Sequence, residues 1–509
     1  MKASSKLLDD SSEQPDAFLL NNADGSLNER SDFLSSPLAS NDAVNSDSLA
    51  DSSDKESQAI VFQYKFIKIN LFQLRYYSFI IIGVSILWPW NCFLSASQYY
   101  SFRFSNSNHP VLGKIYSSVM MSISTITSLI FNFILSNLQK NAKYYKRLII
   151  GNLLNFFIFL ILAITSISFL NINQLFFFNI LLFLIISSAI GVCFEQNGTF
   201  SIANVLGPIY AQAVLVGQAI AGVLPSITLI ISTLLIDIKS LETDQSTDND
   251  DNHPNKETEK NYGVMFYFLT ATFICLFAIL SSYFSIIKFP VFNKDHNSDY
   301  TPLENTSLIN NTIDDDDNNN TTYSQKKKVP FILLWKKLNY IFSTIVITFS
   351  ISLVFPVFAS NIESFNQNNN SKLTNPKIFI PIAYCIWNVG DLSGRVLSGY
   401  KTFQLNNQKF LLIYSILRVF FIPIFFLCNI KKNQNLNNFK VKSDFFYLLI
   451  QFLFGFTNGH LCSNCFMNIS TKFDNDDEKE AAGGFSTVFL SIGLASGSLF
   501  SYVFIPLVS

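Results

Sequence analysis

The chain has 509 residues, of which 49% are hydrophobic and 14% charged, and its formal net charge at pH 7 is −1. This composition is too apolar for an ordinary soluble domain, and the near-zero charge excludes a nucleic-acid partner. The apolar residues come in blocks of roughly 20 or more, the length of a membrane-spanning helix. We therefore predict an all-α polytopic membrane protein that contacts the lipid bilayer, and we exclude a soluble multidomain enzyme.

Residues 1–70 precede the first apolar block and form the predicted cytoplasmic N-terminal tail. Most of this range is rich in Ser, Asp and Asn and has few hydrophobic clusters, which predicts disorder. It contains no pattern typical of a cleavable signal peptide. Lys65, Lys68 and Arg75 flank the start of the first block, and basic residues at that position place the N-terminus in the cytoplasm.

Eleven apolar blocks follow, and we predict that each crosses the membrane as a helix. The first six form an N-terminal bundle, residues 71–287, and the last five form a C-terminal bundle, residues 338–509. An odd number of spans places the C-terminus on the extracytoplasmic side. The predicted spans are 71–99, 111–137, 148–170, 175–194, 205–236, 264–287, 338–360, 378–400, 410–428, 445–469 and 483–508.

Residues 288–337 form a predicted cytoplasmic linker between the two sets of spans. An acidic, Asn-rich run precedes three consecutive lysines there, and this composition is typical of disorder. The basic residues of the linker and of the connection at 140–147 both fall on the cytoplasmic side, whereas the lysines at 431–442 are an exception. Two bundles joined by a long linker are typical of a transporter whose solute site lies between its halves.

Two short motifs lie in predicted loops. Asn369 begins an N-x-S glycosylation acceptor in an outer loop. In the linker, Glu304 stands four residues before Leu308 and Ile309, which is a loose form of an acidic dileucine sorting signal. The seven cysteines lie in or beside the apolar spans and are interpreted as buried hydrophobes, so we predict neither a metal site nor a cofactor.

The stretch 380–400 is apolar enough for a membrane span, yet it contains Asp391 and Arg395. On a helix these two residues lie four positions apart, share a face with Asn388 and can form an ion pair. Either charge at the middle of a bilayer costs about 2.5–3.5 kcal/mol, so such residues normally face a partner or a cavity. A structural ion pair and a polar lining for a solute both remain open, and we favour the second.

Four further spans contain polar residues that need a partner or water. Glu195 and Gln196 stand near the end of the fourth span, and Asn458 and His460 stand in the tenth. Arg418 in the ninth span precedes an apolar run and is interpreted as a packing residue. His460 is interpreted as a hydrogen-bonded core residue more readily than as a proton carrier.

These side chains fit a neutral solute with hydroxyl groups and a flat ring. A carboxylate accepts hydrogen bonds from neighbouring hydroxyls, an amide pairs with the edge of a heterocycle, and an aromatic ring stacks on it. A nucleoside meets this description better than an ion does. A sugar is not excluded by the chemistry.

Several segments resemble the equilibrative nucleoside transporters. The segment LWPWNCFLSASQYY in the first span is similar to one motif of that family, and IWNVGDLSGR is similar to its eighth-span signature. Further similar segments are GQAIAG, LRVFFIPIFFLCNI, FGFTNGHLCSN and EAAGGFSTVFLSIGLASGSLFSYVF. The resemblance extends from about residue 76 to the C-terminus. It implies a major-facilitator-like fold that lacks the twelfth helix, in a 6+5 arrangement.

The resemblance also implies roles for individual residues. Asp391 and Arg395 are expected to hold the ribose, and Gln196 to contact the nucleobase. The remaining cavity positions implied by the resemblance are Trp90, Leu87, Leu94, Asn388 and Tyr384. Leu94 stands where family members often have methionine, and Glu195 stands where an apolar residue is common.

We therefore predict a nucleoside transporter, not an enzyme, that works by facilitated diffusion and possesses a solute site between its halves. Nucleobases are further candidate substrates. Because of Glu195 and His460, a proton-coupled nucleoside carrier or an organic-cation carrier stays open, and a solute-sensing receptor is a more remote alternative. We predict a monomer in the plasma membrane, with an endolysosomal or vacuolar membrane as the alternative.

Overall fold

The computed structural model describes residues 60–64, 67–105, 110–140, 142–168, 172–243, 262–288, 328–365, 372–430, 441 and 443–508, and nearly all of them are helical. The predicted glycosylation acceptor Asn369 lies outside the described residues. The predicted sorting residues Glu304, Leu308 and Ile309 also lie outside them.

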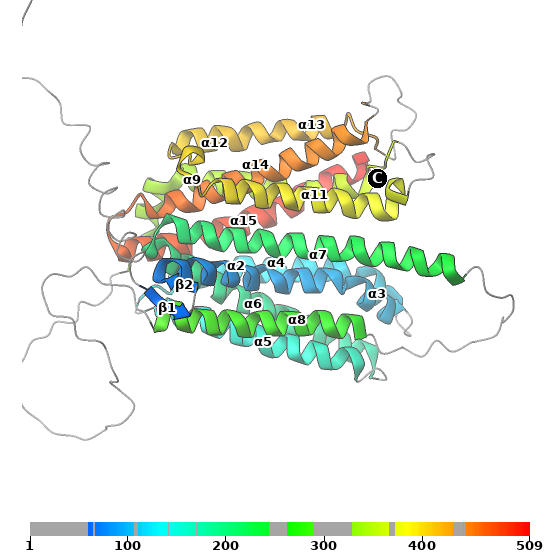
Figure 1. Ribbon diagram of the computed structural model, residues 1–509, viewed down its shortest axis with the longest axis horizontal. Helices are drawn as coiled ribbons and strands as arrows, with labels where there is room; N and C mark the ends of the chain where they lie inside the picture. The colour runs from blue at the N-terminus through cyan, green and yellow to red at the C-terminus, as the bar shows by residue number, and fades with distance from the viewer. Residues whose placement is uncertain are drawn as a thin grey trace, which may run out of the picture. The chain divides into compact units, whose positions relative to one another are not determined.

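The part of the chain before the linker contains one short hairpin and seven α-helices (Figure 1). Strands β1 (Ile60–Tyr64) and β2 (Ile67–Asn70) pair antiparallel, within the range predicted to be a disordered tail. The helices are α2 (Leu71–Ser95), α3 (Ser97–Ser105), α4 (Pro110–Asn137), α5 (Tyr144–Ile167), α6 (Gln174–Leu206), α7 (Pro208–Thr243) and α8 (Tyr262–Ser282), which continues into the π-helical turn η1 (Tyr283–Ile287).

The part after the linker contains six α-helices and three short 3₁₀ segments within the described residues. The α-helices are α9 (Phe331–Ser352), α10 (Phe355–Asn361), α11 (Pro376–Leu397), α12 (Gln408–Leu417), α13 (Phe421–Phe425), α14 (Asp444–Ser470) and α15 (Asp476–Val508), of which α10 and α13 are short. The 3₁₀ segments are η2 (Lys372–Thr374), η3 (Lys401–Phe403) and η4 (Arg418–Phe420).

Ten helical segments of the described chain are long and apolar enough to cross a membrane. The helix α11 is not among them, because its polar residues lower its mean hydropathy. The predicted set of eleven spans therefore includes one helix that length and apolar composition do not select. The exact count, and its division into six and five, stay predictions.

The joint between α6 and α7 differs from the prediction. The sequence placed the end of the fourth span near residue 194, but α6 continues to Leu206. Residues 195–204 are polar or small in many places and still buried, so hydropathy falls while the helix continues. Gly207 then adopts φ +135°, a conformation that L side chains rarely adopt, and α7 begins at Pro208. Glu195 and Gln196 consequently lie inside α6.

The helices before and after the linker contact one another in two places. The helix α7 packs against both α11 and α14, and α15 packs against α4 and α6. Within each part, α2 packs on α7 and α8, while α14 packs on α11 and α9 (Figure 1). The helix α11 is therefore held between α14 and α7.

Two glycines of α14 explain how closely α11 approaches it. A Cβ atom at Gly459 would collide with the carbonyl oxygen of Asp391, and one at Gly455 would collide with the carbonyl oxygen of Trp387. A larger residue at either position would push the two helices apart. These glycines bring the polar face of α11 within hydrogen-bonding distance of α14.

Candidate solute-binding site

Asp391 and Arg395 form an ion pair on α11. The Nε atom of Arg395 lies 2.9 Å from Oδ2 of Asp391, one helical turn away. The residues are only 3% and 6% exposed. Two charges this deeply buried are stable only when they are paired and their other hydrogen-bonding groups are satisfied.

Both members of the pair make further contacts on neighbouring helices. Asn458 of α14 donates from Nδ2 to Oδ1 of Asp391 at 2.7 Å. On α7, the carbonyl oxygen of Leu215 accepts from Nη1 of Arg395 at 2.6 Å, and Gln212 donates from Nε2 to the carbonyl oxygen of Arg395 at 2.8 Å. The ion pair therefore lies where the helices before the linker meet those after it.

Asn388 lies one turn before the ion pair and also faces α7. Its Nδ2 donates to Oγ of Ser226 at 2.9 Å and to the carbonyl oxygen of Tyr384 at 2.9 Å. Gly222 of α7 leaves room for this side chain, since a Cβ there would lie 2.6 Å from Oδ1 of Asn388. Polar contacts to α7 thus extend along α11 from residue 388 to 395.

Tyr384 lies farther along α11, among aromatic residues of the second part. Its hydroxyl donates to the carbonyl oxygen of Pro356 at 3.4 Å, and its ring meets the edge of Phe355 at a centroid distance of 5.0 Å. Trp387 stacks on the same Phe355 at 4.8 Å. These rings form an aromatic wall beside the polar face of α11.

The other residues predicted to line the cavity make no hydrogen bond to Asp391 or Arg395 within the part of the chain that the structure describes. Gln196 is buried in α6. Trp90 is half-buried in α2, and Leu87 packs against the apolar core of the first part. Leu94, near the end of α2, is 47% exposed. The structure therefore brings together the residues of α11 but does not join these four to them by hydrogen bonds.

Glu195 occupies a separate buried position, between α6, α5 and α2. It is 0% exposed, and Oγ of Ser85 donates to its Oε1. Its Oε2 has no hydrogen-bond partner among the described residues. On the α5 side, Gly151 lies so close that a Cβ there would be 2.6 Å from the backbone nitrogen of Glu195.

His460 is held by a backbone group. Its Nε2 lies 2.9 Å from the carbonyl oxygen of Phe403, and its ring stacks on Phe456 with an interplanar angle of 4°. Because a carbonyl can only accept, Nε2 carries the hydrogen. This contact agrees with the interpretation of His460 as a hydrogen-bonded core residue.

Several residues around the ion pair were not predicted as its partners. The sequence identified Asn458 as polar but did not connect it with Asp391, and it gave no sign of Leu215 or Gln212. The spacing of Gly455 and Gly459 in α14 was the available signal, because small residues four apart mark a face where another helix approaches closely.

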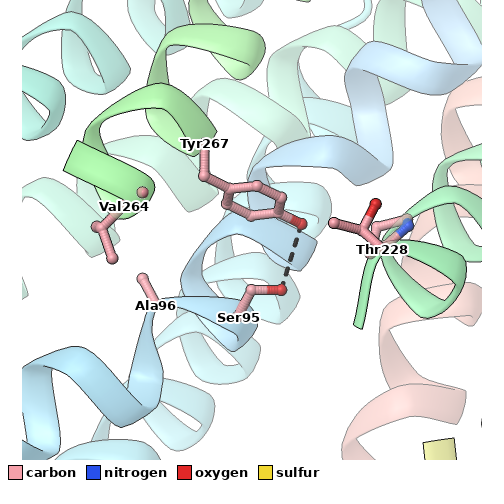
Figure 2. A pocket seen from close by; sticks show the side chains of 7 residues that line it. Ser95, Ala96, Thr228, Val264 and Tyr267 are labelled. Carbon is pink, nitrogen blue, oxygen red and sulfur yellow. Dashed lines mark hydrogen bonds between the residues drawn. The ribbon is translucent and has the colours of Figure 1, made fainter. Parts of the chain in front are cut away.

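A cavity of about 220 Å³ lies away from the ion pair, between α2, α7 and α8 (Figure 2). Ser95 donates from Oγ to the hydroxyl of Tyr267 at 3.2 Å across it. None of the predicted substrate-binding residues lines it, although Leu94 is next to Ser95 in the sequence. The lining residues are Ser95, Ala96, Pro225, Thr228, Gly263, Val264 and Tyr267.

Comparison with known proteins decides the family. Residues 180–505 match the model of a family described as nucleoside transporter. The nucleoside transporter FUN26 of Saccharomyces cerevisiae is 36% identical to this chain, over 86% of the chain and 85% of its own length. The chain belongs to the nucleoside transporter family. This confirms the resemblance inferred from the motifs in α2 and α11.

More distant relatives agree with this membership in the nucleoside transporter family. Equilibrative nucleoside transporter 1 of Rattus norvegicus is 24% identical, over 84% of this chain and 96% of its own length. A solved structure of the major facilitator superfamily proton:xylose symporter XylE has a TM-score of 0.50 at 10% identity and covers 84% of this chain and 88% of that one. That likeness shows the fold alone. This family member is a multi-pass, α-helical membrane protein with a major-facilitator-like fold.

Proposed function

We propose that this protein transports nucleosides across a membrane by facilitated diffusion, with a site reached alternately from either side. The observation that carries the proposal is the buried Asp391–Arg395 pair, which is bound to both α14 and α7. Family membership and the names of the relatives support the substrate class. The two moving bodies are residues 71–287 and 338–509, joined by the linker at 288–337.

In this mechanism the ion pair binds the ribose. The carboxylate of Asp391 accepts hydrogen bonds from neighbouring hydroxyls, and Arg395 donates to the same sugar. In the described conformation Arg395 donates to Leu215 instead. A solute therefore reaches Arg395 when α7 and α11 separate at this contact, which couples binding to the relative movement of the two bodies.

The remaining predicted residues recognise the base in this proposal. The amide of Gln196 pairs with the edge of the nucleobase, and Trp90 with Leu87 borders the cavity from α2. Asn388 and Tyr384 line it from α11, and Leu94 stands at its mouth. Nucleobases, which lack the ribose, are then transported with lower affinity, since they make no contact with Asp391.

The test is uptake of labelled uridine and adenosine in transport-deficient cells that express the wild type, Asp391→Asn or Arg395→Ala at equal surface levels. We expect each variant to lose at least about tenfold in uptake, because a hydrogen bond to a charged group contributes on the order of 1.5–3 kcal/mol. Ser393→Ala is the matched control, since its hydroxyl bonds within α11 to the carbonyl of Val389. Wild-type uptake by both charge variants would remove the site assignment.

A second candidate function is proton-coupled transport of nucleosides or organic cations. It is favoured by Glu195, a fully buried carboxyl group whose Oε2 lacks a partner among the described residues. Uptake is measured between pH 5.5 and 8 at clamped membrane potential, for the wild type and for Glu195→Gln. A pH-dependent flux that Glu195→Gln makes independent of pH supports coupling, whereas a wild-type flux independent of pH and potential excludes it.

We propose the plasma membrane as the location, with the N-terminus in the cytoplasm and the C-terminus outside. An endolysosomal or vacuolar membrane is the alternative if the predicted signal at Glu304, Leu308 and Ile309 functions. Imaging of a tagged chain with and without Leu308→Ala and Ile309→Ala separates the two locations. Asn369 and the monomeric state are tested by glycosidase treatment and by native mass measurement.

A further inference from the structure

Arg418 is a buried arginine that the proposed transport cycle does not use. It begins the 3₁₀ segment η4 after α12 and is 1% exposed. Its Nη1 donates to the carbonyl oxygen of Thr348 at 3.0 Å, and its Nε donates to Oγ1 of Thr457 at 3.2 Å. No carboxylate of the described residues lies within ion-pair distance of it. A guanidinium buried in this way needs a compensating partner farther off.

A chain of hydrogen bonds connects Arg418 to the ion pair. Nη2 of Arg418 donates to Oγ of Ser352 at 3.2 Å, and Oγ of Ser352 lies 2.6 Å from Oδ1 of Asn458. Nδ2 of Asn458 then donates to Oδ1 of Asp391 at 2.7 Å. Four helical segments, η4, α9, α14 and α11, are joined in this way.

The chemistry of the two ends fixes the direction of every bond in the chain. Arginine only donates, so Ser352 must accept from Arg418. An ionised carboxylate only accepts, so Asn458 must present its NH₂ group to Asp391 and its carbonyl to Ser352. The hydroxyl hydrogen of Ser352 is therefore directed at Asn458. A reversal of any one group would leave two donors or two acceptors facing each other.

One competing acceptor lies beside Ser352. The carbonyl oxygen of Thr348 is 2.7 Å from Oγ of Ser352, so the hydroxyl could also donate there. Nη1 of Arg418 already donates to that same carbonyl. Arg418 thus acts on the chain twice, since it donates to Ser352 and occupies the acceptor that would otherwise attract the hydroxyl hydrogen.

We propose that Arg418 is a positioning residue for substrate binding, which acts through Ser352 and Asn458 to hold the carboxylate of Asp391 in a fixed orientation and charge state. The Arg395 side chain fixes Oδ2, and the chain from Arg418 fixes Oδ1. The proposal rests on the function proposed above, in which Asp391 accepts hydrogen bonds from the ribose. Its consequence is selectivity for hydroxyl groups on the sugar.

The experiment compares the KM values of uridine and 3′-deoxyuridine for the wild type, Ser352→Ala and Ser352→Thr. Ser352→Ala interrupts the chain but leaves the bonds of Arg418 to Thr348, Thr457 and Phe454 in place. We expect it to raise the KM of uridine about fivefold to tenfold, with a smaller change for 3′-deoxyuridine and little change in maximal rate. Ser352→Thr keeps a hydroxyl group and is expected to restore the wild-type ratio.

The matched control is Ser350→Ala on the same helix. Its hydroxyl lies 2.7 Å from Oγ of Ser496 on α15 and has no connection to Asp391. A change of the KM ratio in Ser350→Ala equal to that in Ser352→Ala would attribute the effect to packing of α9 and overturn the proposal. Arg418→Lys, which keeps the charge but not the planar set of donors, provides a second variant if Ser352→Ala is poorly expressed, and it is expected to lower the ratio in the same direction.

Asp391→Asn distinguishes failure of this proposal from failure of the proposed function. If Asp391→Asn removes the preference for uridine and both Ser352→Ala and Arg418→Lys keep it, Arg418 does not position the carboxylate. If Asp391→Asn itself keeps the preference, the ribose assignment is wrong and the positioning role falls with it.

Discussion

Two buried carboxylates in this protein have opposite surroundings. Asp391 has an arginine on one oxygen and an amide on the other, and its partners come from α11 and α14. Glu195 has one hydroxyl partner on Oε1 and none among the described residues on Oε2. Asp391 is connected to both parts of the molecule through Arg395, whereas Glu195 is enclosed by helices that precede the linker.

The difference indicates how each group can take part in transport. A fully paired carboxylate at a contact between moving bodies changes its partners when those bodies separate, so it can exchange a protein contact for a solute contact. A carboxylate with a single neutral partner is stabilised by uptake of a proton or a cation. Substitutions that treat the two sites alike in size and charge can test this contrast.

The largest expected effect comes from Arg395→Ala. Removal of the arginine leaves Asp391 buried without a cation, which costs about 3–5 kcal/mol of stability. We expect a large fall in the thermal unfolding temperature of detergent-purified protein, beyond the loss of uptake. Arg395→Ala combined with Asp391→Ala should be more stable than Arg395→Ala alone. Equal stability of the single and double variants would mean that the pair is not coupled.

The comparison is sharpened by two isosteric substitutions, Asp391→Asn and Glu195→Gln. Asp391→Asn removes the charge that Arg395 needs, so we expect a fall in stability. Glu195→Gln removes a charge that has no cationic partner among the described residues and keeps an acceptor for Ser85, so we expect unchanged or higher stability. Unfolding temperatures measured side by side give the sign of each change. A fall of the same size in both variants would contradict the contrast.

A smaller effect is expected from glycine substitutions that press on α11. Gly459→Ala places a methyl group against the backbone of Asp391, and overpacking of this kind costs about 1–3 kcal/mol. Gly222→Ala meets only the side-chain oxygen of Asn388, which can rotate away. We therefore expect Gly459→Ala to lower both stability and uptake more than Gly222→Ala does. The reverse order would show that α11 depends more on α7 than on α14.

The smallest expected effect comes from Ser226→Ala, which removes the hydrogen bond from Asn388 to α7. A neutral hydrogen bond of this kind contributes about 0.5–1.5 kcal/mol. Because the bond joins the two moving parts, we expect a change of about twofold to tenfold in transport rate with little change in unfolding temperature. Thr228→Val is the control, since its hydroxyl bonds within α7 to the carbonyl of Leu224. An equal change in both variants would argue against a role for the Asn388 contact.

The sequence predicted the local part of the site and missed the distant part. Asp391 and Arg395 are four residues apart, so helical geometry alone puts them together. Their contacts with Asn458 and Leu215 depend on how α11 packs between α14 and α7, and one sequence does not encode that packing in any simple pattern. The prediction of Arg418 as a packing residue covers its contact with Phe454 but not its hydrogen-bond chain to Asp391.

The same distinction explains the helix boundaries. Apolar blocks predicted α5, α8 and α14 closely, because a bilayer requires about 20 apolar residues per span. The end of α6 was misplaced by about a dozen residues, since its last turns are polar and buried in protein. The break at Arg418 was also not predicted, because a single arginine within an apolar block gives no sign that the helix narrows to a 3₁₀ turn there.

The low hydropathy of α11 has a consequence for biosynthesis. A helix that contains Asn388, Asp391 and Arg395 gains less from contact with lipid than its neighbours do, so its insertion depends on polar partners. The helix α7 is synthesised earlier and already offers the acceptors Leu215 and Ser226 when α11 emerges from the ribosome. Asn458 follows later on α14. Substitutions in α7 should therefore affect the yield of correctly inserted protein as well as its rate of transport.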